Sequence, residues 1–303
     1  MERILKAFKD LFNCENPIKR HLLYVLLMVL PSVAGAFAGY IDKETPKEMM
    51  LILLAVALFF LILSIVPLVT LLGFGMEFFE MRLRGESGFP RLAQDQFSKG
   101  LKTLPLAIIW SIYYGFIVIL FVGAPVAVAI TTCMSLKDNV LAIVGIVLLT
   151  ILVISILLIG LTLLTPFINY IFIRFVKDYK YKGEYLNLFT VIKYIKKSFK
   201  STIMVFLKMF LAGIVLGMCA SIIVALLTVL MLGLVFMVSV TTPETSGVDA
   251  SYTPAMLLVM IPFSVLGGII QTYVSNLISF AASDQYVEVY KNEIEPTENE
   301  FEI

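Results

Sequence analysis

The sequence has few of the residues that carry catalysis or bind metal. Its 303 residues include one histidine, one tryptophan and three cysteines, and the cysteines lie far apart, at Cys14, Cys133 and Cys219. A single histidine excludes a histidine cluster around a metal ion, and three scattered cysteines predict no disulfide framework. No nucleotide-binding or nucleophile motif is present. We therefore predict no enzyme activity, no catalytic residue, no cofactor and no metal site.

Charge is scarce as well. Charged residues make up 15% of the chain, whereas 60% of the residues are hydrophobic and the mean hydropathy is +0.97. A globule of this size in water cannot bury so large an apolar fraction. We therefore expect lipid to be the solvent and the protein to be an integral membrane protein. The expected partners are membrane lipids and not nucleic acid.

Six apolar segments are long enough to cross a bilayer as helices, which takes roughly 20 mostly apolar residues. They are residues 21–40, 49–75, 104–133, 140–173, 203–240 and 255–282. None alternates apolar and polar residues as the strands of a membrane barrel do. The predicted fold class is an all-α membrane protein with six transmembrane helices. Segment 203–240 is longer than one bilayer crossing needs, which leaves three alternatives. It is one helix whose first turns lie in the headgroup layer, one helix that projects beyond the bilayer, or two helical pieces with a break near Gly213 and Gly217.

The six segments pair into units that close on similar short endings. The endings are Arg-Leu-Arg-Gly-Glu at 82–86, Lys-Tyr-Lys-Gly-Glu at 180–184 and Val-Tyr-Lys-Asn-Glu at 289–293. This internal repeat predicts three tandem helical hairpins, about 1–86, 87–184 and 185–292, within a single transmembrane domain over 1–292. Residues 293–303 form an acidic tail, and such a charge block is typically disordered.

The distribution of Lys and Arg predicts the orientation. On the predicted topology 20 of the 23 cations lie on the face that holds both termini, and only Lys43, Lys47 and Lys137 lie on the other. The positive-inside rule therefore places the N- and C-termini in the cytoplasm, with the protein in the cytoplasmic membrane as a multipass protein. A competing interpretation is that the first apolar segment is a cleavable signal peptide, and its removal would leave five spans.

Cytoplasmic segments before the hairpins have helical amphipathicity, which is typical of helices lying in the membrane interface. They are residues 4–12, a weaker middle copy at 89–97, and 188–200. In the last copy the lysines Lys193, Lys196, Lys197 and Lys200 fall away from the apolar face. We identify these four as candidate contacts to lipid headgroups, which would favour anionic lipids. A cytoplasmic protein partner or a homo-oligomer is the other expectation for this basic face.

The spans carry no charged residue at mid-bilayer, so the candidates for a solute pathway are uncharged. They are Asn169, Gln271, Ser275 and Asn276, although hydrogen bonding between helices is the commoner role of such residues. Pro67 and Pro166 occupy similar places in the first two hairpins and predict matched kinks. Repeated spans with kinks favour, as the alternative to a lipid-binding membrane protein, a small-solute transporter or channel.

One stretch resembles a known family. Arg84-Gly85-Glu86, Phe89-Pro90 and Phe97-Ser98-Lys99-Gly100-Leu101-Lys102, followed by an apolar span, are similar to the prokaryotic multipass membrane proteins known as domain of unknown function 4013. In that family the stretch after the proline is acidic and carries tryptophan, whereas residues 91–95 here have no tryptophan and one acid. The resemblance implies an uncharacterised integral membrane protein and supplies no ligand residues.

Overall fold

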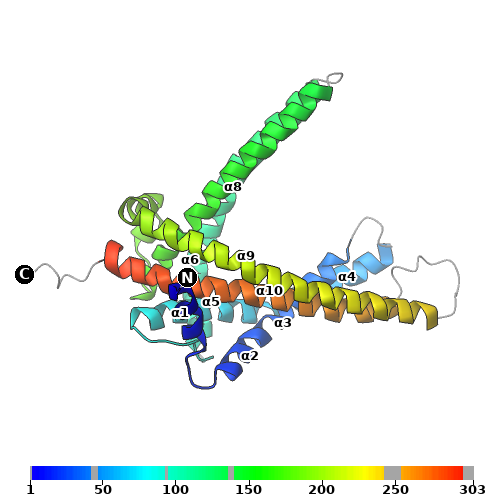
Figure 1. The fold of residues 1–303 in the computed structure, drawn as a ribbon, viewed down its shortest axis with the longest axis horizontal. Coiled ribbons are helices and arrows are strands. Elements are labelled where there is room, and N and C mark those ends of the chain that lie inside the picture. Colours follow the sequence, from blue (N-terminus) through cyan, green and yellow to red (C-terminus); the bar gives the residue numbers. More distant parts are fainter. Residues whose placement is uncertain (1, 42–46, 93–94, 136–139, 242–253, 296–303) are drawn as a thin grey trace, which may run out of the picture. The chain divides into compact units, whose positions relative to one another are not determined.

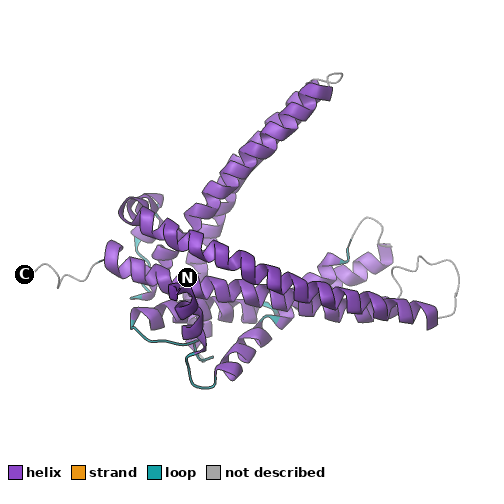
Figure 2. Ribbon diagram, viewed as in Figure 1, coloured by secondary structure: helices purple, strands orange, loops and turns teal. Residues whose placement is uncertain are grey.

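The computed structural model describes residues 2–41, 47–92, 95–135, 140–241 and 254–295, and within these ranges it is helical and contains no strand (Figures 1 and 2). The predicted all-α class is therefore confirmed. In the described chain five helices are long and apolar enough to cross a membrane, or six if one bent pair counts as a single span. The acidic tail beyond residue 295, the loop 242–253 and two of the three outer lysines, Lys43 and Lys137, lie outside the described residues.

The helices follow one another as short and long elements. They are α1 (Glu2–Phe12), α2 (Pro17–Leu27), α3 (Val29–Gly39), α4 (Lys47–Leu63), α5 (Ile65–Leu83), α6 (Asp95–Val118), the π-helical turn η1 (Ile119–Gly123), α7 (Ala124–Ser135), α8 (Val140–Val176), the 3₁₀ turn η2 (Gly183–Leu186), α9 (Leu188–Thr241), α10 (Pro254–Val289) and the π-helical turn η4 (Tyr290–Ile294).

The chain forms two compact units. Unit 1 comprises Met1–Leu101 and Leu207–Asp284, and unit 2 comprises Lys102–Phe206 and Gln285–Ile303. Three helices, α6, α9 and α10, contribute one part to each unit. The grouping by contacts therefore differs from the three predicted hairpins, and the hairpin organisation stays a prediction.

In unit 1 two helices are interrupted three residues before a proline. The breaks fall at Met28, before Pro31, and at Ser64, before Pro67. Proline has no N–H, and its ring collides with the carbonyl four residues earlier, so the preceding helix ends there. The axes of α4 and α5 are bent by 44°. The kink predicted at Pro67 is thus present, whereas α8 runs through Pro166 as one helix.

Aromatic rings form the core of unit 1. Tyr24, Phe74, Phe78, Phe89 and Phe280 come from α2, α5, the following loop and α10, and neighbouring ring centroids lie 4.8–6.0 Å apart. His21 stacks between Phe12 and Phe89, with centroid distances of 4.4 and 3.9 Å. Its Nδ1 lies 2.9 Å from the Tyr273 hydroxyl. These contacts hold α1 against the body of the unit.

The end of α5 is a Schellman motif. Gly85 has a φ of 79°, and the N–H of Glu86 donates to the carbonyl of Met81 at 2.9 Å, which satisfies a terminal carbonyl of the helix. The loop that follows is irregular: Gly88 has a φ of 99°, Phe89 is buried and Pro90 cannot donate. The helix predicted over 89–97 is therefore wrong in its first half, since α6 begins at Asp95.

Unit 2 contains a long hairpin in which α6, η1 and α7 run to the tip and α8 returns (Figure 1). The described side chains of α7 and of the first two-thirds of α8 have no buried member, whereas the end of α8 is enclosed. Trp110 donates from Nε1 to the carbonyl of Tyr185 at 2.9 Å, and the hydroxyl of Tyr170 lies 2.7 Å from Oγ1 of Thr202. These bonds tie α6, η2, α8 and α9 together.

α9 is continuous from Leu188 to Thr241 except at Ser198, whose φ and ψ of −128° and 20° are not helical. Segment 203–240 is therefore one unbroken helix, and the alternative of a break near Gly213 and Gly217 is excluded. The kink at Ser198 separates the amphipathic start of α9 from its apolar remainder. The Ser198 hydroxyl donates to the carbonyl of Tyr194 at 3.0 Å, a bond that can bend a helix.

The three similar endings have three different backbones. The first is the Schellman motif after α5; the second follows a turn at Tyr179, whose φ is 49°, and Gly183 opens η2; the third lies within α10 and η4. Similar sequence at these places does not produce one local structure. The internal repeat remains a prediction from sequence.

Candidate functional site

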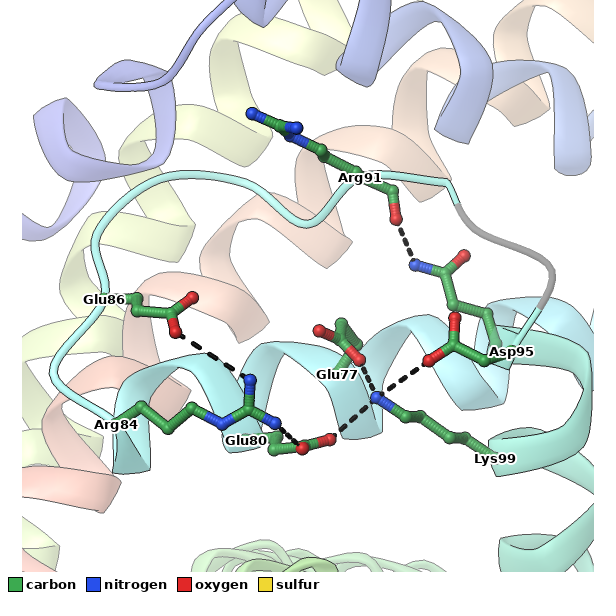
Figure 3. Close-up of polar contacts among 8 residues, drawn as sticks. Glu77, Glu80, Arg84, Glu86, Arg91, Asp95 and Lys99 are labelled. Carbon is green, nitrogen blue, oxygen red and sulfur yellow. Dashed lines mark hydrogen bonds and ion pairs between the residues drawn. The ribbon is translucent and has the colours of Figure 1, made fainter.

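Most cations between the second and third predicted spans are paired with carboxylates inside unit 1. Lys99 bonds to Glu77, to Glu80 at 2.8 Å and to Asp95 at 3.3 Å, and Arg84 pairs with Glu80 (Figure 3). Arg82 lies 2.9 Å from Asp284, and Arg91 lies 2.9 Å from Glu15. This part of the predicted basic face is therefore locally neutralised.

In unit 2 three of the cations that precede α9 are paired as well. Arg174 lies 3.0 Å from Glu184 and Lys182 lies 2.7 Å from Asp178. Lys177 pairs with Glu295, whose carboxylate also accepts from the Tyr290 hydroxyl at 2.7 Å. These pairs hold the end of α8 to the loop and to η4.

The four predicted lysines of α9 differ from these cations. Within the part of the chain that the structure describes, none of Lys193, Lys196, Lys197 and Lys200 makes an ion pair, and all four are exposed. Beside them on the same helix Phe189, Ile192 and Phe199 are exposed at 70%, 44% and 56%. The opposite side of the helix is buried, through Val191, Tyr194 and Ser198. The start of α9 therefore presents cations next to apolar side chains, the arrangement of an interfacial helix.

A polar cleft of about 310 Å³ lies beside this helix in unit 2. Its lining includes Arg174, Glu184, Lys193, Tyr194, Lys197 and Tyr290. Lys197 reaches across it and donates to the carbonyl of Ile294 at 3.2 Å. The structure thus divides the predicted lysines, because Lys193 and Lys197 line the cleft and Lys196 and Lys200 do not.

A second cavity, of about 600 Å³, lies in unit 1 among α3, α5 and α10. Its polar lining is Ser32, Tyr40, Ser264, Thr272 and Asn276, and the rest of the lining is apolar or glycine. The walls include Met28 and Pro31, at one of the two helix breaks.

Of the four residues predicted for a pathway, one lines this cavity. Asn276 does so, with Nδ2 3.5 Å from Sδ of Met28. Gln271 and Ser275 are exposed on α10, and Asn169 belongs to unit 2. The structure therefore does not bring the four together as one site.

Comparison with protein families gives one match. Residues 56–225 match the family described as protein of unknown function (DUF4013), which is more than half of the chain. The chain belongs to the DUF4013 family. Searches of curated proteins and of solved structures give no match for this DUF4013 protein. The resemblance read from residues 84–102 is thereby confirmed, and the matched region reaches well into α9.

Two carboxylates of the DUF4013 protein outside its candidate spans have pKa values set by these contacts. A hydrogen bond from Lys182, aided by the backbone N–H of Lys180, lowers the pKa of Asp178. Burial opposes ionisation of Glu295, but hydrogen bonds from Lys177 and Tyr290 outweigh it, so the pKa of Glu295 also lies below its usual range. Both groups are therefore charged at neutral pH and hold their partners.

The cavity residues Ser32, Tyr40, Ser264 and Thr272 of the DUF4013 protein were not predicted. Hydroxyl residues are common in membrane helices, and only the packing of α3 against α10 shows which of them face one space. Proline was the one available signal, since Pro31 lies in the wall. Among the described residues no group of three or more His, Cys, Asp or Glu could hold a metal ion.

Proposed function

We propose that this protein is a non-catalytic multipass membrane protein whose basic cytoplasmic face binds anionic lipid headgroups. The observation that carries the proposal is the row of four lysines at the start of α9, which make no ion pair within the described part of the chain and lie beside exposed Phe189 and Phe199. A basic residue near an anionic membrane surface contributes about 1 kcal/mol to binding. The apolar side chains supply the insertion that an interfacial helix needs.

The polar cleft is the part of this face best suited to a phosphate group. Lys193 and Lys197 line it and make no ion pair with any residue that the structure describes. Arg174 also lines it, although its pairing with Glu184 neutralises part of its charge. The other lining carboxylate, Glu295, is already held by Lys177 and the Tyr290 hydroxyl. A phosphodiester headgroup would therefore bind mainly through the two lysines, and an acidic protein partner would compete for the same pair.

The test uses the full chain in nanodiscs and two matched double variants. Lys193→Gln with Lys197→Gln removes the cleft lysines, and Lys196→Gln with Lys200→Gln removes the same charge from the same helix outside the cleft. At about 1 kcal/mol per lysine for charge near the membrane surface alone, the cleft variant should retain phosphatidylglycerol at least about 30-fold less well than the wild type. Native mass spectrometry of the retained lipid measures this.

The control variant should lose no more than about 30-fold, because its two lysines contribute only their charge near the membrane surface. The cleft variant should lose more than the control, because its lysines also contact the phosphate directly. Equal retention of phosphatidylglycerol and phosphatidylcholine by the wild type would refute the proposal. Equal losses of phosphatidylglycerol retention in the two double variants would refute the specific role of the cleft. Loss of an acidic protein partner with unchanged lipid retention would assign the face to that partner.

A small-solute pathway is the second candidate function. It is favoured by the cavity of unit 1, which lies among candidate spans and beside the helix break at Met28, as transporter sites often do. Solute flux into proteoliposomes that contain the full chain tests it.

A further inference from the structure

The cavity of unit 1 is lined by hydroxyl and amide groups without any charged residue. Ser32 and Tyr40 come from α3 and the residue after it, and Ser264, Thr272 and Asn276 come from α10. These helices belong to candidate membrane spans. Since polar groups are costly in hydrocarbon unless they are hydrogen-bonded, several of them facing one space indicate a polar occupant.

The hydroxyls elsewhere in unit 1 show how such groups are usually satisfied in these helices. Ser64, Thr70 and Ser279 donate to the carbonyl four residues earlier, at 2.6, 2.8 and 3.1 Å. By contrast, Ser32 and Thr272 make no side-chain hydrogen bond to any residue that the structure describes. The cavity therefore contains hydroxyls that its own helices do not satisfy.

The three remaining polar residues of the lining make two contacts. The Tyr40 hydroxyl lies 2.7 Å from Oγ of Ser264, which links the outer end of α3 to α10. Asn276 contacts the sulfur of Met28, and a thioether is a weak acceptor. The amide of Asn276 can thus exchange this contact for a better one with a ligand.

Glycines leave the space between these groups open. A Cβ built on Gly35, on Gly39 or on Gly268 would meet no atom within 4 Å. A volume of about 600 Å³ is in the range of small-molecule sites.

We propose that this cavity binds an uncharged group that carries several hydroxyls. The absence of charge in the lining disfavours an ion, and paired hydroxyls and an amide recognise hydroxyls through donor and acceptor contacts. Two sources present this chemistry, a free polyol and the sugar headgroup of a neutral glycolipid. The inference concerns binding and holds whether or not the occupant crosses the membrane.

The test uses two variants of the full chain, one that fills the cavity and one that removes its amide group. Gly268→Leu adds bulk where the structure leaves room, so the variant should fold, and Asn276→Leu removes the polar contact. The controls are Gly217→Leu, on α9 and equally free of neighbours, and Gln271→Leu, exposed on α10. Saturation-transfer NMR with myo-inositol probes the free polyol, and native mass spectrometry from nanodiscs doped with monogalactosyl diacylglycerol probes the lipid.

We expect binding in one arm by the wild type and both controls. Asn276→Leu should lose about tenfold, as deletion of one good hydrogen bond predicts, and Gly268→Leu should lose at least as much because the leucine side chain occupies the space. Circular dichroism melting checks that all variants fold. The proposal is overturned if the cavity variants match the wild type in both arms. It is also overturned if phosphatidylcholine is retained as well as the glycolipid, because acyl chains alone would then fill the space.

Discussion

Arg82 shows how a single residue can hold together parts of unit 1 that are distant in sequence. Its guanidinium is buried, lies 2.9 Å from the carboxylate of Asp284 on α10, and donates to the carbonyl of Glu86 at 2.7 Å. It also lies over the ring of Phe78, 4.8 Å from the centroid. One side chain thus joins the Schellman turn to α10.

Replacing Arg82 should therefore be costly. In Arg82→Gln the carboxylate of Asp284 loses its partner while partly enclosed, and we expect the free energy of unfolding to fall by about 3–5 kcal/mol. Equilibrium unfolding of the purified chain in mixed micelles measures the change. Arg91→Gln, which breaks the exposed pair with Glu15, should cost less than about 1 kcal/mol. Similar losses in the two variants would contradict this account.

At the residue scale, the sequence indicated the chemical character of the candidate residues better than it indicated where their side chains lie in the fold. The four lysines of α9 were identified from their spacing, and the structure leaves all four exposed and without an ion pair among the described residues. The pathway residues were chosen only because they are polar within apolar segments. Gln271 and Ser275 face outward on α10 because the rotation of a membrane helix is set by packing, and an apolar sequence gives little indication of it.

At the scale of elements, the crossing of α5 and α6 depends on two glycines. A Cβ on Gly73 would lie 1.8 Å from the carbonyl oxygen of Gln96, and one on Gly100 would lie 1.9 Å from that of Val69. The two backbones are therefore in direct contact, as small residues permit in membrane helices. The loop before α6 is fixed by this contact together with buried Phe89.

Gly100→Ala should push the two helices apart. We expect a loss of about 1–3 kcal/mol in the free energy of unfolding, the usual cost of overpacking. Gly75→Ala is the matched change on α5, where a Cβ meets nothing within 4 Å. Because alanine favours helix over glycine by about 1 kcal/mol, this control should be neutral or stabilising. Thermal denaturation measures the change in stability of both variants, and destabilisation of equal size in the two would contradict the prediction.

The elements themselves were largely predictable. Each of the six apolar segments is helical where the structure describes it, apart from Met28, Tyr40 and Ser64, since long apolar runs in lipid satisfy their backbone only as helices. The error falls in the irregular loop. The kink predicted at Pro67 is present, whereas α8 continues through Pro166, as a helix can when its neighbours accommodate the freed carbonyl. The loop at Phe89 departs from a helix because a tertiary contact, the burial of its ring, overrides weak amphipathicity.

At the scale of the whole molecule, orientation remains a prediction from charge. The described inner cations are numerous, but many are neutralised by nearby carboxylates such as Glu77, Glu80 and Glu184. The positive-inside rule counts Lys and Arg and gives little weight to acids, so this pairing does not weaken it. The grouping into two units could not be predicted, because it depends on which helices meet.

Cysteine labelling tests the orientation. In a chain whose three cysteines are replaced by serine, we expect Ser135→Cys, at the end of α7, to react with an impermeant maleimide in intact cells. Lys196→Cys, on α9, should react only after the membrane is permeabilised, because the positive-inside rule places it in the cytoplasm. The opposite pattern would invert the topology and remove the proposed lipid-binding face from the anionic leaflet.

The position of Trp110 gives the protein a built-in optical reporter. It is the only tryptophan in the sequence, it is buried in unit 2, and its indole bonds to the carbonyl of Tyr185. The ring of Tyr185 in turn lies under Arg174, at the lining of the polar cleft. Tryptophan fluorescence of the unlabelled protein therefore comes from one residue, which is connected to the cleft through Tyr185 and Arg174. A change of tryptophan emission on adding lipid can be assigned to this residue without a dye.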